Sequence, residues 1–420
     1  MRATLLTVVL ILIAVTPLVP AQAAAPALTG QDYVVQAGDT LSELAQKHLG
    51  QAASAPVILL ATNARHLLDP GYAQMLDETS IHPGDKIFIP DQATANRLAA
   101  PPAPGALGSA DKPLQMYFVP SVQVQVIVEG GRDMAKYFLE KTGIHVDVRV
   151  PTSYSAVIEA MGAAEGDIMA FIPALAYVLA HQRYGVEAAL SVVRQGRSWY
   201  TVQFIARRDS QINSLPDLSG KIWAYPEQGS TSGYMVPLTM FNRLGIKPGR
   251  ELSTGGHTNA VIAVYDGSAD FGTTYFSPPG GPSDWKWGDP PEPTGPVKVT
   301  QKAGAWTATE GGLQLRDARV AVLGTYPDVI DQVKIVALGD PIPNDTVSFV
   351  KDFDPVLRAR LVHALLAYSA TPGGQKVLAN PEFYDISGFE FVQDKAFDPV
   401  RDMVKAVGLD LEEKYGLKQK

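Results

Sequence analysis

The stretch Gly229-Ser230-Thr231-Ser232-Gly233-Tyr234 places three hydroxyl side chains between two glycines. It lies between an apolar strand pattern, Lys221–Tyr225, and a helix pattern, Tyr234–Leu244. The first N–H groups of a helix have no intrahelical partner, and the helix dipole is positive at that end. The pattern therefore predicts a cradle for a small tetrahedral oxyanion. An ordinary serine or threonine cap with no ligand would leave the same local sequence.

Ser230–Tyr234, followed by Pro237, resembles the signature of PhnD-like substrate-binding proteins, which serve ABC importers of phosphonate, phosphite and phosphate. Further blocks of that family follow in the same order over about residues 113–410: Leu139–Gly143, Ser153–Met161, Gly166–Ile168, Arg207–Lys221, Gly255–His257, Ala263–Asp270 and Pro341–Asp345. The resemblance implies an α/β fold of the two-lobed periplasmic-binding-protein type (type II). It also implies a ligand held between the lobes.

Composition limits the possible classes of function. The chain has 420 residues, a hydrophobic fraction of 46% and a net charge of −8, and it contains no cysteine. This length suits two or three domains, and the mixed charges do not suggest a nucleic-acid surface. The lack of cysteine excludes disulfides, thiolate chemistry and a lipid-modified cysteine anchor. We expect neither a metal nor a cofactor, and we expect a monomer.

The first residues predict export. Arg2 precedes an apolar run from Leu5 to Val19, and Ala21-Gln22-Ala23 offers small residues for cleavage. Residues 1–23 are therefore interpreted as a secretory signal peptide, the alternative being an uncleaved membrane anchor. The mature protein is expected in the periplasm or the cell wall, without a lipid anchor.

A second resemblance covers residues 32–90. The opening Tyr33–Leu41 and the ending Pro83–Pro90 are similar to a LysM (lysin motif) domain of βααβ order. That family binds N-acetylglucosamine glycans, chiefly peptidoglycan, and the resemblance places the sugar at Gly38, Asp39, Thr40, Leu41, Leu67 and Leu68. The connection from Leu67 to Ser80 is longer than the family pattern. Gly38–Thr40 could equally form a turn and cap that only builds the fold.

The rest of the chain divides into a linker and a main body. Residues 91–113 are rich in alanine and proline, which predicts an extended linker. Residues 114–420 alternate strand and helix patterns, which indicates a sheet covered by helices. The resemblance implies lobe one at about 114–205 and 338–420, and lobe two at about 206–337. The loop-rich segment 277–312 is expected to be either a lid or a hairpin packed on its own lobe.

The resemblance also assigns the ligand pocket. The oxyanion is expected at the Ser230–Gly233 loop and His257, and a protonated imidazole there would make binding weaken as pH rises. The full expected set is Ser230, Thr231, Ser232, Gly233, His257, Tyr154, Phe171 and Asp345. Tyr154 could instead be an aromatic core residue at a helix start.

Departures from the family pattern narrow the expected ligand. Asp345 matches a carboxylate that faces the amino group in aminophosphonate binders, but Tyr275-Phe276 occupies the stretch where a second carboxylate is expected. Phe171 lacks the hydroxyl of a tyrosine that some relatives carry. These changes favour phosphite, phosphate or a simple alkylphosphonate.

Two other classes of protein compete with a transport function. A LysM-tethered enzyme that processes wall glycans is one, and a wall-binding protein with no small ligand is the other. The central residue of Gly229–Gly233 is Thr231, so the G-x-S-x-G motif of serine hydrolases does not match. The sequence favours a non-enzymatic binding protein that delivers its ligand to an ABC permease.

Overall fold

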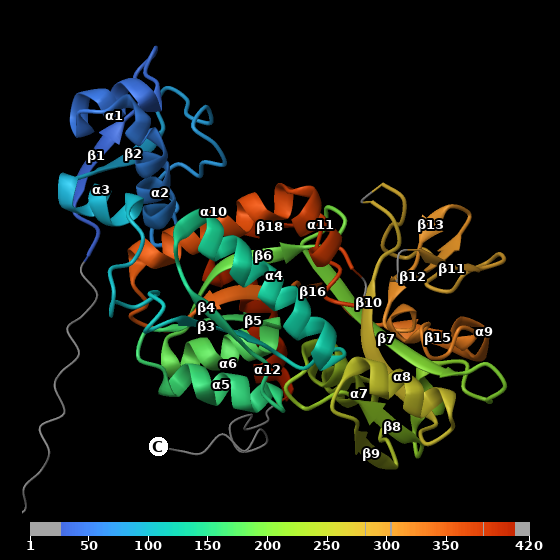
Figure 1. Cartoon of the computed structure of the whole chain (residues 1–420). Helices are drawn as coiled ribbons and strands as arrows, with labels where there is room; N and C mark the ends of the chain where they lie inside the picture. The colour runs from blue at the N-terminus through green and yellow to red at the C-terminus, as the bar shows by residue number, and fades with distance from the viewer. Residues whose placement is uncertain (1–26, 282, 303–304, 381, 408–420) are drawn as a thin grey trace, which may run out of the picture.

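The computed structural model describes residues 27–281, 283–302, 305–380 and 382–407. They form a small N-terminal domain and two larger lobes, arranged in a row (Figure 1). The expected signal peptide lies outside the described residues. Within the described ranges, none of the helices combines the length and the apolar character needed to cross a bilayer.

The N-terminal domain has the expected βααβ order. Strand β1 (Gly30–Val34) pairs antiparallel with β2 (Lys86–Pro90), and helices α1 (Leu41–Leu49) and α2 (Ala55–His66) lie between them in the chain, joined by the short 3₁₀ turn Ala52–Ser54. The Thr40 hydroxyl accepts a hydrogen bond from the Glu43 N–H at 3.2 Å, which caps α1. Gly50 ends this helix in the left-handed conformation.

The long connection between α2 and β2 is held by one side chain. The Asn63 amide donates to the Met75 carbonyl at 2.6 Å and accepts from the Met75 N–H at 2.9 Å. These two bonds fix the middle of the connection, and the Met75 side chain is fully buried in the core of the domain. The extra residues therefore contribute to the core.

The expected linker is partly helical, which corrects the sequence interpretation. Residues Gln92–Ala99 form helix α3, capped by Asp91, whose carboxylate accepts from the Thr94 N–H at 2.8 Å. Ala95 and Leu98 are three residues apart and both are buried. Their side chains gain a hydrophobic environment only through tertiary packing, so the alanine- and proline-rich composition alone did not predict this helix.

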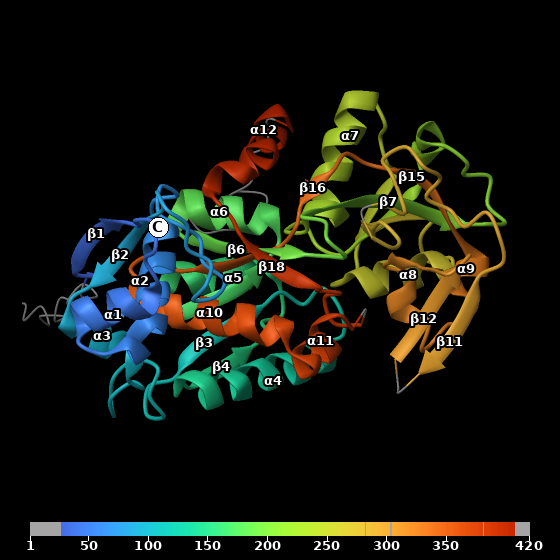
Figure 2. The same cartoon turned by 90° about the horizontal axis from the view of Figure 1, so that it is seen from above.

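Helix α3 and the N-terminal domain pack against lobe one. Their hydrophobic cluster includes Val356 and Ala359 of helix α10 (Pro355–Ala370), which lies beside α2 in both views (Figures 1 and 2). Arg97 of α3 forms an ion pair with Asp354 at 2.6 Å. Asp354 also caps α10 by accepting from the Val356 N–H at 2.8 Å. The small domain is thus joined to lobe one by a shared core.

Lobe one is built on a six-stranded sheet in the order β18-β6-β17-β5-β3-β4. Its strands are β3 (Leu114–Phe118), β4 (Val146–Arg149), β5 (Ile168–Ile172), β6 (Glu187–Val193), β17 (Thr346–Phe349) and β18 (Gly388–Phe391). Besides α10, its helices are α4 (Val124–Thr142), α5 (Tyr154–Ala163), α6 (Ala174–Tyr184), α11 (Pro372–Leu378) and α12 (Asp398–Val407). The sheet is mixed, with β3, β4 and β5 parallel and β17 antiparallel to β5.

Lobe two is built on the strand order β15-β7-β10-β8-β9, with the short strands β14 and β16 added at β10 and β7. Its strands are β7 (Trp199–Arg207), β8 (Ile222–Tyr225), β9 (Arg250–Ser253), β10 (Phe271–Ser277), β14 (Arg316–Asp317), β15 (Val333–Leu338) and β16 (Ile342–Pro343). Its helices are α7 (Val236–Leu244), α8 (His257–Tyr265) and α9 (Val329–Gln332).

The lobe boundaries differ from those expected. The sequence placed the two crossings between the lobes at residues 205–206 and 337–338. Both positions lie inside continuous strands, because β7 pairs with β10 along most of its length and β15 pairs with β7. Lobe two therefore begins with β7 and ends with β16. Asn344 fastens the two crossings together, because its amide donates to the carbonyls of Val192 at 2.8 Å and Arg197 at 2.9 Å.

The segment 277–312 packs on its own lobe. Strands β11 (Lys298–Lys302) and β12 (Ala305–Glu310) form a hairpin, and β13 (Leu313–Gln314) pairs with β12. Trp285 and Ala308 join the hydrophobic cluster of lobe two. Of the two alternatives left by the sequence, the structure shows the packed hairpin.

The shared core between α3 and α10 gives a testable stability prediction. Leu98→Ala should lower the free energy of unfolding by about 2–5 kcal/mol, because it leaves a cavity where a buried leucine joined two domains. Leu68→Ala, at a leucine that is 58% exposed, is the matched control and should change it by less than about 0.5 kcal/mol. Urea unfolding followed by fluorescence measures both. Equal stability of the two variants would contradict the shared core.

Candidate ligand-binding site

The two lobes enclose a cavity of about 60 Å³. One water needs about 10–15 Å³ measured in this way, so the space suits a small ion of a few heavy atoms. Its wall combines apolar side chains with hydroxyls, one imidazole and several charged groups. The cavity is therefore small, and its polar and charged groups are set into a wall that is mostly apolar.

The Ser230–Gly233 loop reaches this cavity at the end of β8. A π-helical turn, Thr231–Met235, precedes α7, and the Ser230 hydroxyl caps it by accepting from the Gly233 N–H at 3.0 Å. A Cβ atom on Gly233 would lie 2.4 Å from Pro226 Cδ, so only glycine fits there. Ser230 and Ser232 line the cavity, whereas Thr231 and Gly233 do not. Ser230 therefore acts as a cap and is also a wall residue.

Thr231 contacts the opposite lobe. Its hydroxyl accepts from the Leu175 N–H at 2.9 Å, in the first turn of α6. The Glu227 carboxylate similarly accepts from the Tyr154 N–H at 2.9 Å, at the start of α5. Lobe two thus supplies partners for free N–H groups at the N-termini of two helices of lobe one. These bonds exist only while the lobes are together, so they stabilise the closed arrangement.

His257 is the first residue of α8, and its backbone N–H donates to the Ser121 carbonyl of lobe one at 3.1 Å. The ring lies against Tyr275, with centroids 5.1 Å apart, and Nε2 is 3.3 Å from the Ser230 oxygen. Burial, and secondarily the charge of Arg194, lowers the pKa of His257 from 6.5 to about 3. The imidazole is therefore neutral near pH 7. The expected weakening of binding with rising pH required a protonated imidazole, so this condition is not met.

Of the other three expected residues, Tyr154 and Asp345 line the cavity and Phe171 does not. Tyr154 lines the cavity and is 1% exposed. Asp345 also lines it, but its carboxylate is already paired with Arg194 at 2.7 Å. Phe171 does not line the cavity, and its ring stacks on Phe118 with centroids 4.7 Å apart. Phe171 belongs to the core of lobe one, because inward-facing side chains of neighbouring strands β3 and β5 meet there.

Sequence reasoning missed most of the charged groups in the wall. Arg194 and Arg316 line the cavity together with Asp317 and Asp385. Arg316 of lobe two forms an ion pair with Asp385 of lobe one. Arg194 also donates to the Asn344 side-chain oxygen at 2.9 Å. Arg316 and Asp385 are 69 positions apart, and Arg194 and Asp345 are 151 positions apart, so no local spacing signals such pairs.

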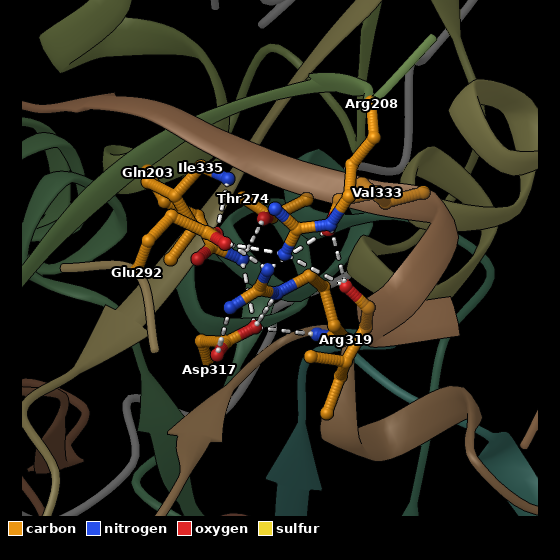
Figure 3. Close-up of polar contacts among 9 residues, drawn as sticks. Gln203, Arg208, Thr274, Glu292, Asp317, Arg319, Val333 and Ile335 are labelled. Carbon is orange, nitrogen blue, oxygen red and sulfur yellow. Dashed lines mark hydrogen bonds and ion pairs between the residues drawn. The ribbon is translucent and has the colours of Figure 1, made fainter. Parts of the chain in front are cut away.

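Asp317 connects the cavity to a buried ionic network (Figure 3). The fully buried Arg319 guanidinium donates to both Asp317 oxygens, at 2.8 and 3.0 Å, and to Glu292 at 2.6 Å. Burial and these neighbours act in opposite directions on Asp317, and the net effect lowers its pKa. Glu292 comes from the 277–312 segment and also forms an ion pair with Arg208. These contacts attach the segment to the rest of lobe two.

Some of the expected glycan-binding residues of the N-terminal domain are buried or hydrogen-bonded within the fold, and others are exposed. Asp39 accepts from the Tyr33 hydroxyl at 2.8 Å and from the Gln36 N–H at 2.7 Å, and Leu41 is 1% exposed in the core. Leu67 packs against the core of the main body, while Gly38, Thr40 and Leu68 are exposed. The structural role of Asp39, Thr40 and Leu41 is evident, and the exposed positions remain open to a ligand.

Comparison with known families places the chain. Residues 116–397 match the family described as periplasmic substrate-binding proteins of ABC phosphonate transporters. The chain belongs to this family. Residues 33–55 match the LysM domain, so this chain carries an N-terminal LysM domain in addition. Both resemblances seen in the sequence are confirmed.

Individual relatives match the chain in sequence or in fold. The phosphate-import protein PhnD of Mycolicibacterium smegmatis is 30% identical over 156 residues, 34% of this chain and 48% of that protein. The chain thus spans about half the length of this curated relative. A binding-protein component of an ABC phosphonate transporter from Pseudomonas aeruginosa gives a TM-score of 0.55 at 19% identity, over 70% of this chain and 86% of its own.

A second solved structure, PhnD1 from Prochlorococcus marinus in complex with methylphosphonate, gives a TM-score of 0.52 at 14% identity. The match covers 70% of this chain and 98% of that one. At these identities the solved structures show a shared fold, and the two-lobed class expected from the sequence is confirmed.

The buried imidazole gives a pH prediction. In the unfolded chain, a histidine binds a proton as pH falls below its pKa of 6.5. The buried ring of His257 binds a proton only when pH falls to about 3. Stability from burying neutral His257 is therefore fully present above about pH 6.5 and is lost as pH falls toward about 3. Between about pH 7 and pH 5, wild type should lose about 2 kcal/mol more unfolding free energy than His257→Gln.

Urea unfolding at the two pH values measures this difference. His82→Gln is the control, because that side chain is 79% exposed and the variant should lose as much stability as wild type. A His257→Gln variant that loses as much stability as wild type would show that the native imidazole is not held neutral.

Proposed function

We propose that this protein captures a small phosphorus oxyanion between its two lobes and presents it to an ABC permease. The observation that carries this proposal is the convergence of Ser230, Ser232 and neutral His257 on an ion-sized cavity. Ser230, Ser232 and His257 are buried, and neutral donors in fixed positions stabilise an anion without having to be reorganised. Membership of the phosphonate-binding family supports the same ligand chemistry.

Phosphite, phosphate and simple alkylphosphonates are the proposed ligands. The cavity of about 60 Å³ leaves little room for a substituent beyond the tetrahedral group. Asp345 is neutralised by Arg194 and is not free to pair with a ligand ammonium group. Tyr275 supplies an aromatic face at the stretch where a second carboxylate was expected. These features disfavour a zwitterionic aminophosphonate.

The binding proposal makes a direct prediction. Isothermal titration calorimetry should show that one of phosphite, phosphate and methylphosphonate binds with a Kd of about 1 µM or lower. Ser232→Ala should weaken that binding by about 1–3 kcal/mol, because the closed cavity loses a hydroxyl at the anion. Ser268→Ala, at an exposed serine outside the cavity, is the matched control and should bind like wild type.

Two results would contradict the proposal. Absence of binding by all three anions would contradict the oxyanion function. Unchanged affinity of Ser232→Ala would remove that hydroxyl from the site.

The proposed location is outside the cytoplasm, with the LysM domain as a tether to peptidoglycan. The family is periplasmic and its described relatives are transporter components, which supports export and a function without catalysis. The shared core with α10 joins such a tether to lobe one. The protein would then be held near the wall without a lipid anchor.

The tether predicts binding to insoluble peptidoglycan. The full chain should co-sediment with purified peptidoglycan, and N-acetylglucosamine oligomers should release it. Leu68→Ala should reduce the bound fraction because it removes an exposed apolar side chain from the expected sugar groove. Leu244→Ala, a leucine of lobe two that is 50% exposed, is the control. A wild-type protein that stays in the supernatant would refute the tether.

A further inference from the structure

Asp385 has an unusual set of properties for a cavity residue. Its backbone has a φ of 51°, in the left-handed region that residues other than glycine seldom adopt. Its side chain is only 10% exposed, although it carries a carboxylate. A strained backbone and a buried charge both cost free energy, and such features cluster where a ligand is bound.

The two oxygens of this carboxylate differ. Oδ1 accepts from the Arg316 guanidinium of the opposite lobe, while Oδ2 is buried and has no hydrogen-bond partner among the described residues. Burial raises the pKa of Asp385, and the charge of Arg316 opposes that rise. A buried carboxylate oxygen in an anion-binding cavity is satisfied only by a hydrogen-bond donor.

The other two carboxylates that line the cavity are each paired with an arginine. Asp345 is paired with Arg194, and Asp317 is paired with Arg319. The neutral His257 ring contributes no positive charge to offset a second negative charge on the ligand. A free acceptor in such a wall repels a ligand that presents only oxygen lone pairs. It attracts a ligand that presents an acidic hydrogen.

We propose that Asp385 selects oxyanions that retain one acidic hydrogen, and that its Oδ2 atom accepts the hydrogen bond from that P–O–H group. Ser230, Ser232 and His257 would hold the remaining oxygens. The ligand class is thus a protonated phosphorus oxyacid anion, and sulfonates or sulfate of the same shape are rejected. This inference rests on the proposed function, because it assigns a specificity-determining residue to the same cavity.

Methylphosphonate and methanesulfonate test this selection, since they are close in shape but only the former carries an acidic hydrogen. At one fixed pH and salt concentration, wild type should bind methylphosphonate at least about 10- to 100-fold more tightly than methanesulfonate. In Asp385→Asn, the amide oxygen can accept from Arg316 and its NH₂ group replaces Oδ2. This variant should lose most of the discrimination, because an amide donates to a sulfonate oxygen.

Asparagine tolerates the left-handed backbone, so the substitution adds little strain. Asp209→Asn is the matched control, because that ion-paired aspartate is 69% exposed and lies outside the cavity. It should retain the wild-type ratio of the two dissociation constants. If Asp385→Asn does not fold, the wild-type ratios for methylphosphonate against methanesulfonate and for phosphate against sulfate decide the question.

The outcomes separate this inference from the proposed function. Wild type that binds methylphosphonate and methanesulfonate within about threefold of each other overturns the inference and leaves the function intact. The same holds if Asp385→Asn keeps the wild-type ratio. Tighter binding of 2-aminoethylphosphonate than of methylphosphonate assigns Oδ2 to an ammonium group and also overturns it. Wild type that binds no phosphorus oxyanion overturns both proposals.

Discussion

Charge pairing in the buried wall of the cavity is the constraint on which the site depends. A charge removed from water is tolerated only when it is paired and hydrogen-bonded. Arg194 with Asp345 and Arg319 with Asp317 meet this condition, and Arg316 with Asp385 meets it at one carboxylate oxygen. The wall therefore carries ionic groups without a large net charge, and in the proposed function the anion is recognised by hydroxyls, an imidazole and the remaining lone pairs.

The same pairing links recognition to the relative position of the lobes. Arg316 and Asp385 come from different lobes, as do Thr231 and the Leu175 N–H. Glu227 completes the N-terminus of α5 in a similar way. Opening the lobes would return these groups to water, and closing them completes the cavity and the helix ends together. Two-lobed proteins of this kind close by hinge motion, and the crossings at Asn344 lie where such a hinge is expected.

The N-terminal domain extends this arrangement beyond the ligand site. It shares buried side chains with α10 and an ion pair between Arg97 and Asp354, so it is attached to lobe one (Figure 2). A tether acting through this domain would hold lobe one at the wall and leave lobe two to move. The 277–312 segment is attached to the other lobe, because Glu292 connects it to Arg208 and Arg319 within lobe two.

The sequence by itself determined the features that depend on local spacing. The Ser230–Gly233 loop, the capped helix α1 and the alternation of strands and helices are recognisable because caps and periodicity act over a few residues. Two family patterns gave the fold class. Only the tertiary structure decided the rest: helix α3 forms against a distant helix, and Phe171 turns into the core. Asp385 meets Arg316 across the cleft, and burial of the His257 ring lowers its pKa. Desolvation and long-range pairing depend on which surfaces the topology brings together, and no short stretch of sequence carries that information.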